Sequence, residues 1–352
     1  MDLSSSSNTC FHFVCTNYGS NKDGIGHYTY KVVNELKKNN SLEILVYSKI
    51  TYNLSKLELL FSLKMTFELL KLKRALKKNS KKNYIILEYP FVEYNPIFLI
   101  ALFLIKRIKN SSSKIVVSLH EYQRTKLFRK VFIRLLIQLS DIILFTKSED
   151  VENFMNQRIN FRSRNIPANI EPSSNKKVKS SKTINVSFFG IINLETKEIH
   201  NMLKGWSLYL KKEKENRIKF HFITSSYNEQ VKNNMDLEYH FNLNDVKVSN
   251  LVHEMHFMIL PLKPKISINN GSFSVGCIHR CIPVGVFDER FFSEAFGLRM
   301  KNYSKEEFER IFKIINHLNF EQMKEKSNLA YEYGKVKSVR KTAESYFDLT
   351  IS

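Results

Sequence analysis

The stretch that most constrains the fold lies at residues 259–285, close to the end of the sequence. Its first four residues, Ile-Leu-Pro-Leu, predict a buried strand, and its last four predict a second strand. Between the two strands, a loop with Asn270, Gly271 and Ser272 leads into a short helical segment. Backbone N–H groups at a helix start, together with the helix dipole, bind phosphate well. The stretch therefore predicts an α/β domain with a phosphate-binding loop. The alternative is an ordinary strand–turn–helix–strand unit.

The opening of the chain shows a similar succession of apolar strand and amphipathic helix. Residues 11–15 predict a strand and residues 28–38 a helix, with Gly24 and Gly26 in the loop between them. Glycine permits positive φ angles and lets a ligand approach the backbone closely. Because the loop lacks the GxGxxG pattern, it does not indicate dinucleotide binding, and a plain tight turn is the alternative. The unit is typical of the start of a doubly wound parallel sheet.

Two polar side chains, His120 and Glu121, follow the predicted strand at residues 114–119. Open α/β sheets bind their ligands at the carboxyl ends of the strands. Both residues are therefore candidates for substrate binding. For His120, a structural role in a hydrogen bond is the alternative.

A lysine follows a predicted strand in the second half of the chain. The strand at residues 184–189 ends at Gly190, and a polar loop with Asn193 leads to Lys197 at the start of the next helix. An ammonium group at a helix N-terminus is well placed to bind phosphate. The alternative is a solvated lysine without a ligand.

The chain has 352 residues, which is enough for two α/β domains of ordinary size. Residues 158–182 lose the hydrophobic periodicity and contain two prolines and a run rich in Ser, Lys and Asn. Such a composition marks a domain boundary. We therefore expect an N-terminal domain at residues 1–165 and a second domain at residues 166–333.

The formal net charge of +21 favours anionic partners such as nucleic acid, phosphorylated sugars or an anionic membrane. Residues 1–165 hold 27 lysines and arginines against 13 acidic residues, and the remainder holds 28 against 21. The basic residues of the predicted helices 54–78 and 124–139 are candidates for contact with anionic lipid. In the first of these helices they also complement the helix dipole. No RRM, KH or helix-turn-helix signature is present, so we expect no nucleic acid partner.

The four cysteines form no CxxC motif and no Cys/His cluster with zinc spacing, so we expect buried thiols and no metal site. The polar first residues predict no signal peptide. The longest apolar run, residues 97–105, is far shorter than the roughly 20 residues that a spanning helix needs. We therefore expect a cytoplasmic protein, in solution or at the inner face of the cell membrane.

The order and spacing of these motifs resemble those of retaining GT-B glycosyltransferases. The resemblance is to the family 4 type, which serves bacterial polysaccharide, capsule, lipopolysaccharide and O-antigen synthesis. The glycine loop, the His-Glu pair, the strand–Gly–Lys segment and the Gly-Ser loop before Pro283 follow this order along nearly the whole chain. Some positions differ from the family pattern. Asp23 replaces the first of two paired glycines, and Asn193 lies near the place of the usual arginine. Ile268 and Gly276 replace the two glutamates of the family's commonest form.

The resemblance implies two Rossmann-like α/β domains that face each other across a cleft, with residues 334–352 crossing back to the N-terminal domain. It also implies transfer of a sugar, with retention, from a nucleoside diphosphate sugar to a hydroxyl of a lipid-linked or growing surface glycan. Lys197 and backbone amides near Gly271 and Ser272 would neutralise the leaving diphosphate. His120 would position the sugar. Such an enzyme uses no cofactor besides its donor substrate.

The resemblance further implies a set of substrate-binding residues around these catalytic ones. They are Gly24, Gly26, Glu121, Asn193, Asn270, Gly271, Ser272 and Phe273. Two other interpretations stay open. The missing glutamates and arginine would also suit a catalytically silent GT-B scaffold or partner subunit. A nucleic-acid binder is supported by the net charge alone.

Overall fold

The computed structural model describes most of the chain, and it falls into two compact units. The described residues are 9–19, 24–39, 42–49, 63–78, 81–89, 96–109, 112–120, 127–145, 160–164, 167–173, 182–233, 236–267, 270–288 and 295–351. One unit comprises Met1–Ile166 with Val339–Ser352, and the other comprises Pro167–Ser338. The units therefore part after residues 166 and 338, whereas the predicted boundaries follow residues 165 and 333.

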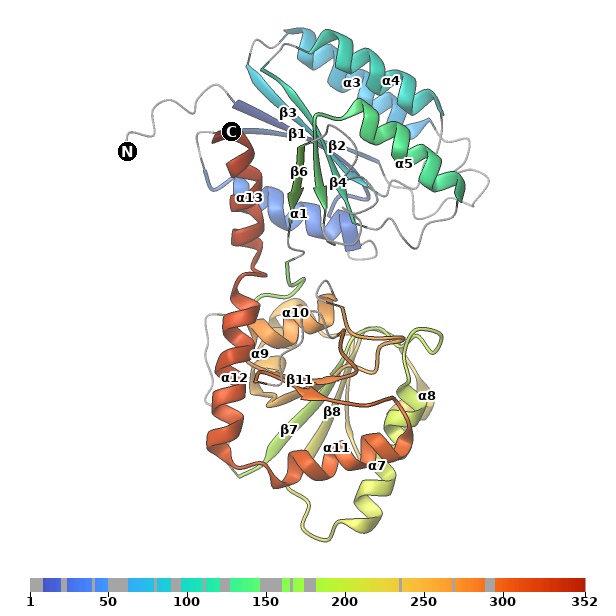
Figure 1. Ribbon diagram of the computed structural model, residues 1–352, viewed down its shortest axis with the longest axis vertical. Coiled ribbons are helices and arrows are strands. Elements are labelled where there is room, and N and C mark those ends of the chain that lie inside the picture. The colour runs from blue at the N-terminus through green and yellow to red at the C-terminus, as the bar shows by residue number, and fades with distance from the viewer. Residues whose placement is uncertain are drawn as a thin grey trace. The chain divides into compact units, whose positions relative to one another are not determined.

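In its described residues, the first unit is built on a six-stranded parallel sheet of order β2-β1-β3-β4-β5-β6 (Figure 1). Its strands are β1 (Thr9–Thr16), β2 (Leu42–Lys49), β3 (Lys82–Tyr89), β4 (Lys114–Leu119), β5 (Ile142–Phe145) and β6 (Asn160–Ser163). The chain runs from β1 to β2 on one side and then returns to β3 on the other side. The strand order therefore reverses between β1 and β3.

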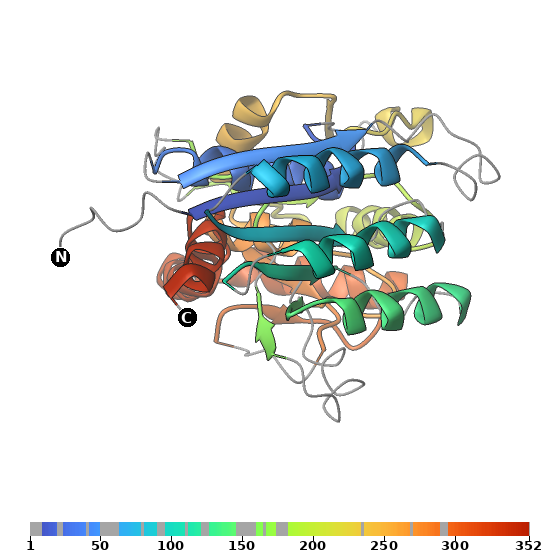
Figure 2. The same ribbon diagram turned by 90° about the horizontal axis from the view of Figure 1, so that it is seen from above.

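Helices cover both faces of this sheet (Figure 2). They are α3 (Lys64–Lys78), α4 (Pro96–Ile108) and α5 (Leu127–Leu139) on one face, and α1 (Gly24–Leu36) and α13 (Val339–Ile351) side by side on the other. Leu69, Leu102 and Leu136 fill the first core, and Val33 and Tyr346 belong to the second. Because both faces are covered, β1, β3 and β4 are buried along almost their whole length, as is usual for a parallel sheet.

The described residues of the second unit form another six-stranded parallel sheet, of order β12-β11-β10-β7-β8-β9. Its strands are β7 (Ile184–Phe189), β8 (Ile218–Thr224), β9 (Glu238–Phe241), β10 (Phe257–Ile259), β11 (Ile282–Gly285) and β12 (Leu298–Arg299). Counted from β7 in chain order, the sheet reads 3-2-1-4-5-6 from β9 to β12. This is the strand order of a Rossmann fold, whose order reverses between β7 and β10.

The helices of the second unit also pack on both faces of its sheet. They are α7 (Ile199–Lys212) and α11 (Lys305–His317) on one face, and α9 (Asp245–Glu254), α10 (Gly271–Ile278) and α12 (Phe320–Lys335) on the other, with the short α8 (Glu229–Lys232) after β8. Trp206 of α7 and Phe312 of α11 meet in the first of these cores, with ring centroids 4.9 Å apart. Phe273 of α10 lies in the second core.

The predicted fold class of two Rossmann-like domains is confirmed, whereas the cleft between them stays a prediction. Two local predictions were wrong. Helix α1 begins at Gly24, so Gly24 and Gly26 lie in its first turn and not in a loop. Strands β6 and β12 were missed, because each is a short edge strand with a mixed polar and apolar sequence. Of the predicted helix 54–78, residues 54–62 lie outside the described residues.

Candidate functional site

The segments that follow β7 and β10 meet at the point where the strand order of the second sheet reverses. Phe188 of β7 and Ile259 of β10 are direct partners in the sheet, but the chain continues from them toward opposite edges. A crevice forms at the carboxyl ends of two such strands, and open α/β sheets bind ligands there. Gly190 follows β7, and the loop before α10 follows β10. The fold therefore brings two of the sequence-predicted segments to one place.

Gly190 lies at the centre of this place. Its φ angle is +133°, a backbone conformation that side chains rarely adopt. A Cβ added here would lie 2.9 Å from Nζ of Lys197 and 3.1 Å from Oγ of Ser272. The ammonium and the hydroxyl thus converge on the space above the glycine backbone. Glycine is required here both by the φ angle and by this close approach.

Lys197 is held in place by backbone pairing next to β10. Lys197 forms an isolated antiparallel bridge with Leu262, and the N–H of Glu198 donates to the carbonyl of Pro261 at 2.8 Å. Asn193 shapes the preceding turn, because its Oδ1 accepts hydrogen bonds from the N–H groups of Glu195 (2.9 Å) and Thr196 (3.2 Å). Asn193 therefore positions the loop that carries the lysine, by a contact within its own turn.

The ammonium of Lys197 is half-buried and has no carboxylate partner within the described residues. Nζ donates to the carbonyl of Ile191 at 2.5 Å and lies 5.0 Å from the centre of the Phe188 ring. Burial lowers the pKa of Lys197 to about 8. A cation in this environment gains most from an anion that replaces the lost water, so the site favours a negatively charged ligand.

The N-terminus of α10 completes the site. Asn270 is the N-cap, and its Oδ1 accepts the N–H of Phe273 at 2.9 Å. Within the described chain, the N–H groups of Gly271 and Ser272 have no hydrogen-bond partner. A Cβ added at Gly271 would be in ordinary van der Waals contact with Oδ1 of Asn169, at 3.9 Å. The ammonium of Lys197 and the hydroxyl of Ser272 thus lie beside the start of α10, which makes this place a candidate phosphate site.

Phe273 is placed differently from the other predicted residues of this loop. Its side chain is fully buried in the core of the unit, where its ring centroid lies 5.5 Å from Tyr333 and 6.1 Å from Phe287. Its backbone N–H is taken by Asn270. The residue therefore anchors the start of α10 from within the core.

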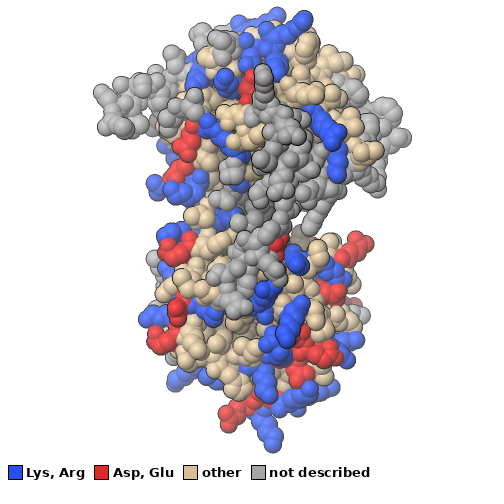
Figure 3. All heavy atoms as spheres, viewed as in Figure 1, with Lys and Arg blue, Asp and Glu red and all other residues tan. Residues whose placement is uncertain are grey.

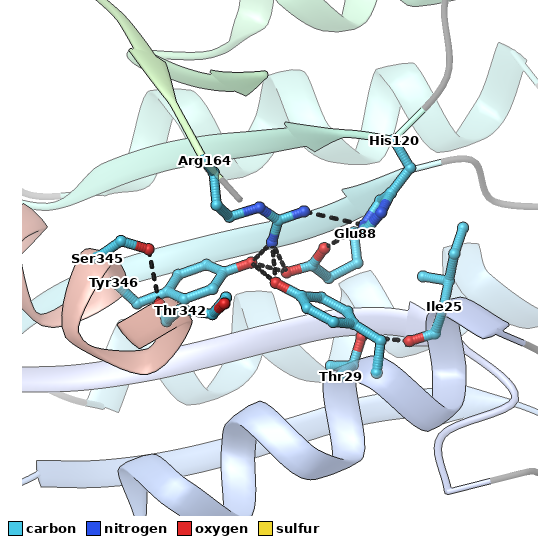
Figure 4. Close-up of polar contacts among 9 residues, drawn as sticks. Ile25, Thr29, Glu88, His120, Arg164, Thr342, Ser345 and Tyr346 are labelled. Carbon is cyan, nitrogen blue, oxygen red and sulfur yellow. Dashed lines mark hydrogen bonds and ion pairs between the residues drawn. The ribbon is translucent and has the colours of Figure 1, made fainter. Parts of the chain in front are cut away.

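The first unit holds a second polar arrangement, a buried cluster of five side chains on five elements (Figure 4). Its members are Tyr28 (α1), Glu88 (β3), His120 (after β4), Arg164 (after β6) and Tyr346 (α13). The Glu88 carboxylate contacts His120 Nε2 at 2.8 Å and Arg164 Nη1 at 3.5 Å. The Arg164 guanidinium also donates to the hydroxyls of Tyr28 and Tyr346, and Tyr346 donates to Glu88.

The charges of this cluster compensate one another inside the fold. Burial would raise the pKa of Glu88, but the Arg164 charge and the hydrogen bonds from His120 and Tyr346 hold that pKa at about 2. Burial raises the pKa of Tyr28 and Tyr346, so both hydroxyls stay protonated. The cluster fastens the C-terminal helix α13 to the sheet through a carboxylate and a guanidinium.

Three predicted binding residues of the first unit are His120, Glu121 and Gly26. The Nε2 atom of His120 contacts the Glu88 carboxylate, and the ring meets the Tyr28 ring edge-on with centroids 5.3 Å apart. Nε2 therefore has the structural hydrogen-bonding role that was the alternative to substrate binding. Glu121 lies outside the described residues. Gly26 packs against backbone: a Cβ there would lie 2.1 Å from the carbonyl oxygen of Asn17. Gly26 therefore lets the first turn of α1 approach the end of β1.

Sequence reasoning missed four members of the cluster, namely Tyr28, Glu88, Arg164 and Tyr346. One signal was available. Glu88 is a carboxylate near the end of a strand whose other central residues are apolar, and such a buried charge needs a partner. Arg164 lies in the stretch interpreted as a linker, and Tyr346 is 258 residues away from Glu88 in the sequence. Neither partner could be found from local pattern.

Comparisons with known proteins support the fold. A scan against family models and a search of curated proteins gave no match. Among solved structures, the chain is similar to the N-terminal domain of Candida albicans trehalose-6-phosphate phosphatase, with 10% identity, coverage of 98% and 96% of the two chains and a TM-score of 0.65. It is also similar to a trehalose-6-phosphate synthase studied for enzymatic glycosyltransfer with retention. The sequence identity is 11%, the match covers 97% of this chain and 98% of the synthase chain, and the TM-score is 0.61.

A third solved structure is that of the pneumococcal O-GlcNAc transferase GtfA in complex with UDP and GlcNAc. Its identity to the chain is 9%, and the match covers 80% of this chain and 59% of GtfA, with a TM-score of 0.55. At such identities these likenesses show the fold alone. The chain has the GT-B fold, made of two Rossmann-like units. Among the described helices, none combines the length and hydropathy needed to cross a membrane.

Proposed function

We propose that the protein is a glycosyltransferase that transfers a sugar from a nucleoside diphosphate sugar to a hydroxyl group. The observation that carries this proposal is the convergence of Lys197 and Ser272 over Gly190, beside the N-terminus of α10. The donor diphosphate would occupy this space. The GT-B fold and the GtfA complex with UDP, which belongs to a protein of the same fold, support a nucleotide-sugar donor.

The chemistry that this site would supply is stabilisation of the leaving group. Negative charge develops on the diphosphate as the bond to the sugar breaks. The Lys197 ammonium and the Ser272 hydroxyl converge over Gly190. With the amides of Gly271 and Ser272, they would stabilise this charge with little reorganisation. We propose retention of configuration, which the synthase of similar fold is reported to show.

His120 is proposed to position the donor sugar from the first unit. Its ring orientation is fixed by Glu88 at 2.8 Å and by the edge-on contact with Tyr28. Glu88 and Arg164 would act through His120 and not on the sugar. In this proposal the buried cluster serves both to fix the histidine and to fasten α13.

The acceptor is proposed to be a lipid-linked or growing surface glycan, reached at an anionic membrane. The outer faces of α3, α4 and α5 support this, because they expose large apolar side chains. These are Phe67, Ile97, Ile100, Phe103, Ile108, Leu127, Val131 and Leu135, with exposed fractions from 36% to 80%. The stripe at Leu127, Val131 and Leu135 has helical spacing.

Charge on the same three helices is almost purely basic. Over their bounds they hold a single carboxylate, Glu68, which is buried and paired with Lys71 at 2.8 Å. Figure 3 shows lysine and arginine side chains gathered over the end of the first unit where α3 and α4 lie. Exposed apolar residues among basic ones suit the surface of an anionic bilayer.

A catalytically silent GT-B scaffold is the second candidate, and one observation favours it. Gly276 stands where the family's commonest form has a ribose-binding glutamate, and it packs against β10. A Cβ at Gly276 would lie 2.9 Å from Sδ of Met258. The fold therefore leaves little room for that carboxylate.

One experiment separates the two candidates. A panel of UDP-, GDP-, ADP- and dTDP-sugars is titrated calorimetrically into the full-length protein, and release of the nucleoside diphosphate is measured in parallel. Binding with turnover, both lost in Lys197→Ala, supports the enzyme. Binding without turnover supports the scaffold. If no sugar nucleotide binds, the proposed glycosyltransferase activity is wrong.

A further inference from the structure

Three side chains that commonly bind metals meet at the edge of the second sheet, apart from the proposed donor site. His221 in β8 is the direct partner of Glu238 in the edge strand β9, and His240 lies two residues further along β9. Paired residues of parallel strands, and residues two apart in one strand, point to the same face of a sheet. The register of β8 and β9 therefore gathers all three side chains on one face.

The ligand atoms form a compact triangle. Nδ1 of His221 lies 3.1 Å from Oε2 of Glu238 and 3.1 Å from Nε2 of His240, and this Nε2 lies 3.7 Å from the same carboxylate oxygen. Ligands at about 2.0–2.1 Å from a tetrahedral zinc ion are roughly 3.3 Å from one another. The triangle thus has the size of one face of a tetrahedral zinc site.

Hydrogen bonds alone do not satisfy this triangle when both rings are neutral. If Nδ1 of His221 donates to Glu238, the lone pair of His240 Nε2 faces the carboxylate oxygen. If Nε2 of His240 instead donates to Nδ1 of His221, that Nδ1 has its lone pair toward Glu238. If Nδ1 of His221 and Nε2 of His240 both carry protons, their N–H groups face each other. Each arrangement therefore keeps one repulsive contact, between two acceptors or between two donors. A cation that accepts all three lone pairs removes it.

We propose that His221, Glu238 and His240 bind a divalent transition-metal ion of the zinc class, with water as the fourth ligand. Two imidazoles and one carboxylate are ligands that zinc prefers. The sequence did not reveal the site, because His221 and Glu238 meet only through the register of β8 and β9.

Metal ions bind imidazole in its neutral form and carboxylate in its ionised form. The carboxylate of Glu238 is kept ionised by Lys219, whose Nζ lies 2.6 Å from Oε1 and leaves Oε2 for the metal.

Two features limit the affinity. Lys219 brings a positive charge close to the site. Nε2 of His221 is buried without a hydrogen-bond partner among the described residues. Loss of such an outer partner typically weakens metal binding by about 10–100-fold. With three protein ligands and no hydrogen-bond partner for Nε2 of His221 among the described residues, we expect a dissociation constant on the order of 1 µM for Zn²⁺.

A metal bound at this site would link strand β9 to strand β8, because its ligands come from both strands. Strand β9 has four residues and pairs within the described chain with β8 alone, so it is an edge strand with few hydrogen bonds. A metal that binds the folded state but not the unfolded chain stabilises the fold in proportion to the logarithm of its concentration. Zn²⁺ should therefore raise the melting temperature.

The test is a calorimetric titration of Zn²⁺ into full-length protein freed of metal with a chelator. His240→Gln removes one partly exposed ligand, and His200→Gln, an exposed histidine on α7, is the matched control. We expect one Zn²⁺ per chain in the wild type and in His200→Gln, with affinity at least about 10-fold weaker in His240→Gln. Mg²⁺ should give no binding at the same concentration, since it prefers oxygen ligands.

Two further measurements distinguish loss of the metal site from a folding defect in His240→Gln. Glu238→Gln, at a half-exposed position, should weaken Zn²⁺ binding in the same way. Co²⁺ bound to the wild type should give the visible absorption of a tetrahedral N/O site, and this band should vanish in His240→Gln. Equal Zn²⁺ affinity of the wild type and both ligand variants would overturn the proposal, as would the absence of binding to the wild type.

Discussion

The ammonium of Lys197 and the hydroxyl of Ser272 approach one point above the backbone of Gly190, at 2.9 Å and 3.1 Å from where a Cβ would be. The two side chains belong to the segments after β7 and β10, which meet where the strand order of the second sheet reverses. The bridge between Lys197 and Leu262 joins these segments. An anion in this space would contact the ammonium, the hydroxyl and the N-terminus of α10 together. The proposed function depends on this convergence.

Gly190→Ala tests whether the space above the glycine is the binding site. The methyl group would push aside Lys197 and Ser272 and would occupy the place of the phosphate. We expect donor binding to weaken by at least tenfold, with a loss of stability of about 1–3 kcal/mol from the strained φ angle. Calorimetry and urea unfolding measure the two effects.

Gly19→Ala is the matched control for this substitution. Gly19 also has a positive φ angle (+78°), but its nearest neighbour would be a ring carbon of Tyr30 at 3.6 Å, in the first unit. A similar loss of stability is expected, with donor affinity unchanged. If both alanine variants bind donor as well as the wild type does, Gly190 is not at the site.

The charge of Lys197 should make donor binding depend on pH. Because burial lowers the pKa to about 8, the ammonium is fully present near pH 6.5 and is lost as the pH rises through 8. Donor affinity should therefore fall above pH 8, by up to about tenfold per pH unit. In Lys197→Arg the charge persists, so the affinity should vary little between pH 7 and 9.5. Equal pH profiles for the two proteins would exclude an electrostatic role of Lys197.

Glu88→Gln should destabilise the first unit strongly. It leaves the buried guanidinium of Arg164 without its carboxylate, which costs about 3–5 kcal/mol. Glu43→Gln breaks the exposed pair with Lys81 and should change the stability little, because solvent screens such a pair. Chemical denaturation of both variants measures the difference. Equal and small losses would show that the cluster does not fasten α13.

The Glu88 carboxylate should also make the stability of the wild-type protein depend on pH in the acid range. The pKa of Glu88 is about 2 in the folded protein and about 4.3 in an unfolded chain. A depressed pKa stabilises the fold above the unfolded value, so about 3 kcal/mol is present above pH 5 and is lost as the pH falls from 4 to 2. In Glu88→Gln this part of the acid dependence should be missing.

Val131→Glu tests the proposed membrane contact. The substitution puts a negative charge into the exposed apolar stripe of α5, so binding to vesicles with 30% phosphatidylglycerol should fall several-fold. Val246→Glu changes an exposed valine of the second unit and should leave vesicle binding unchanged. Co-sedimentation with these vesicles, and with neutral phosphatidylcholine vesicles, measures the effect. If the wild-type protein does not co-sediment with anionic vesicles, the proposed membrane contact is wrong.

The two segments of the proposed donor site could be located from the sequence because their pattern is local. Each consists of an apolar strand, a glycine-containing turn and a helix start, and the strand order of a doubly wound sheet brings the two turns together. Gly190, Lys197, Asn270 and Ser272 were accessible in this way. Phe273 lies in the same loop, but sequence adjacency could not tell its buried ring from the partly exposed Gly271 and Ser272 before it.

The buried cluster could not be predicted, because its members come from distant parts of the chain. Tyr346 reaches Glu88 only because α13 packs beside α1 on the first sheet. Arg164 follows β6, a four-residue edge strand whose sequence, Asn-Phe-Arg-Ser, lacks a strand pattern. Which residues join the buried cluster is therefore determined by long-range packing and not by local propensity.

The most direct test of the central claim is a crystal structure of the protein with bound UDP or, if UDP does not bind, with the nucleoside diphosphate that binds best in the titration. The proposal predicts a β-phosphate within hydrogen-bond distance of Nζ of Lys197 and of the hydroxyl and N–H of Ser272. A nucleotide whose phosphates lie elsewhere, with Lys197 still bonded to the carbonyl of Ile191, would contradict it.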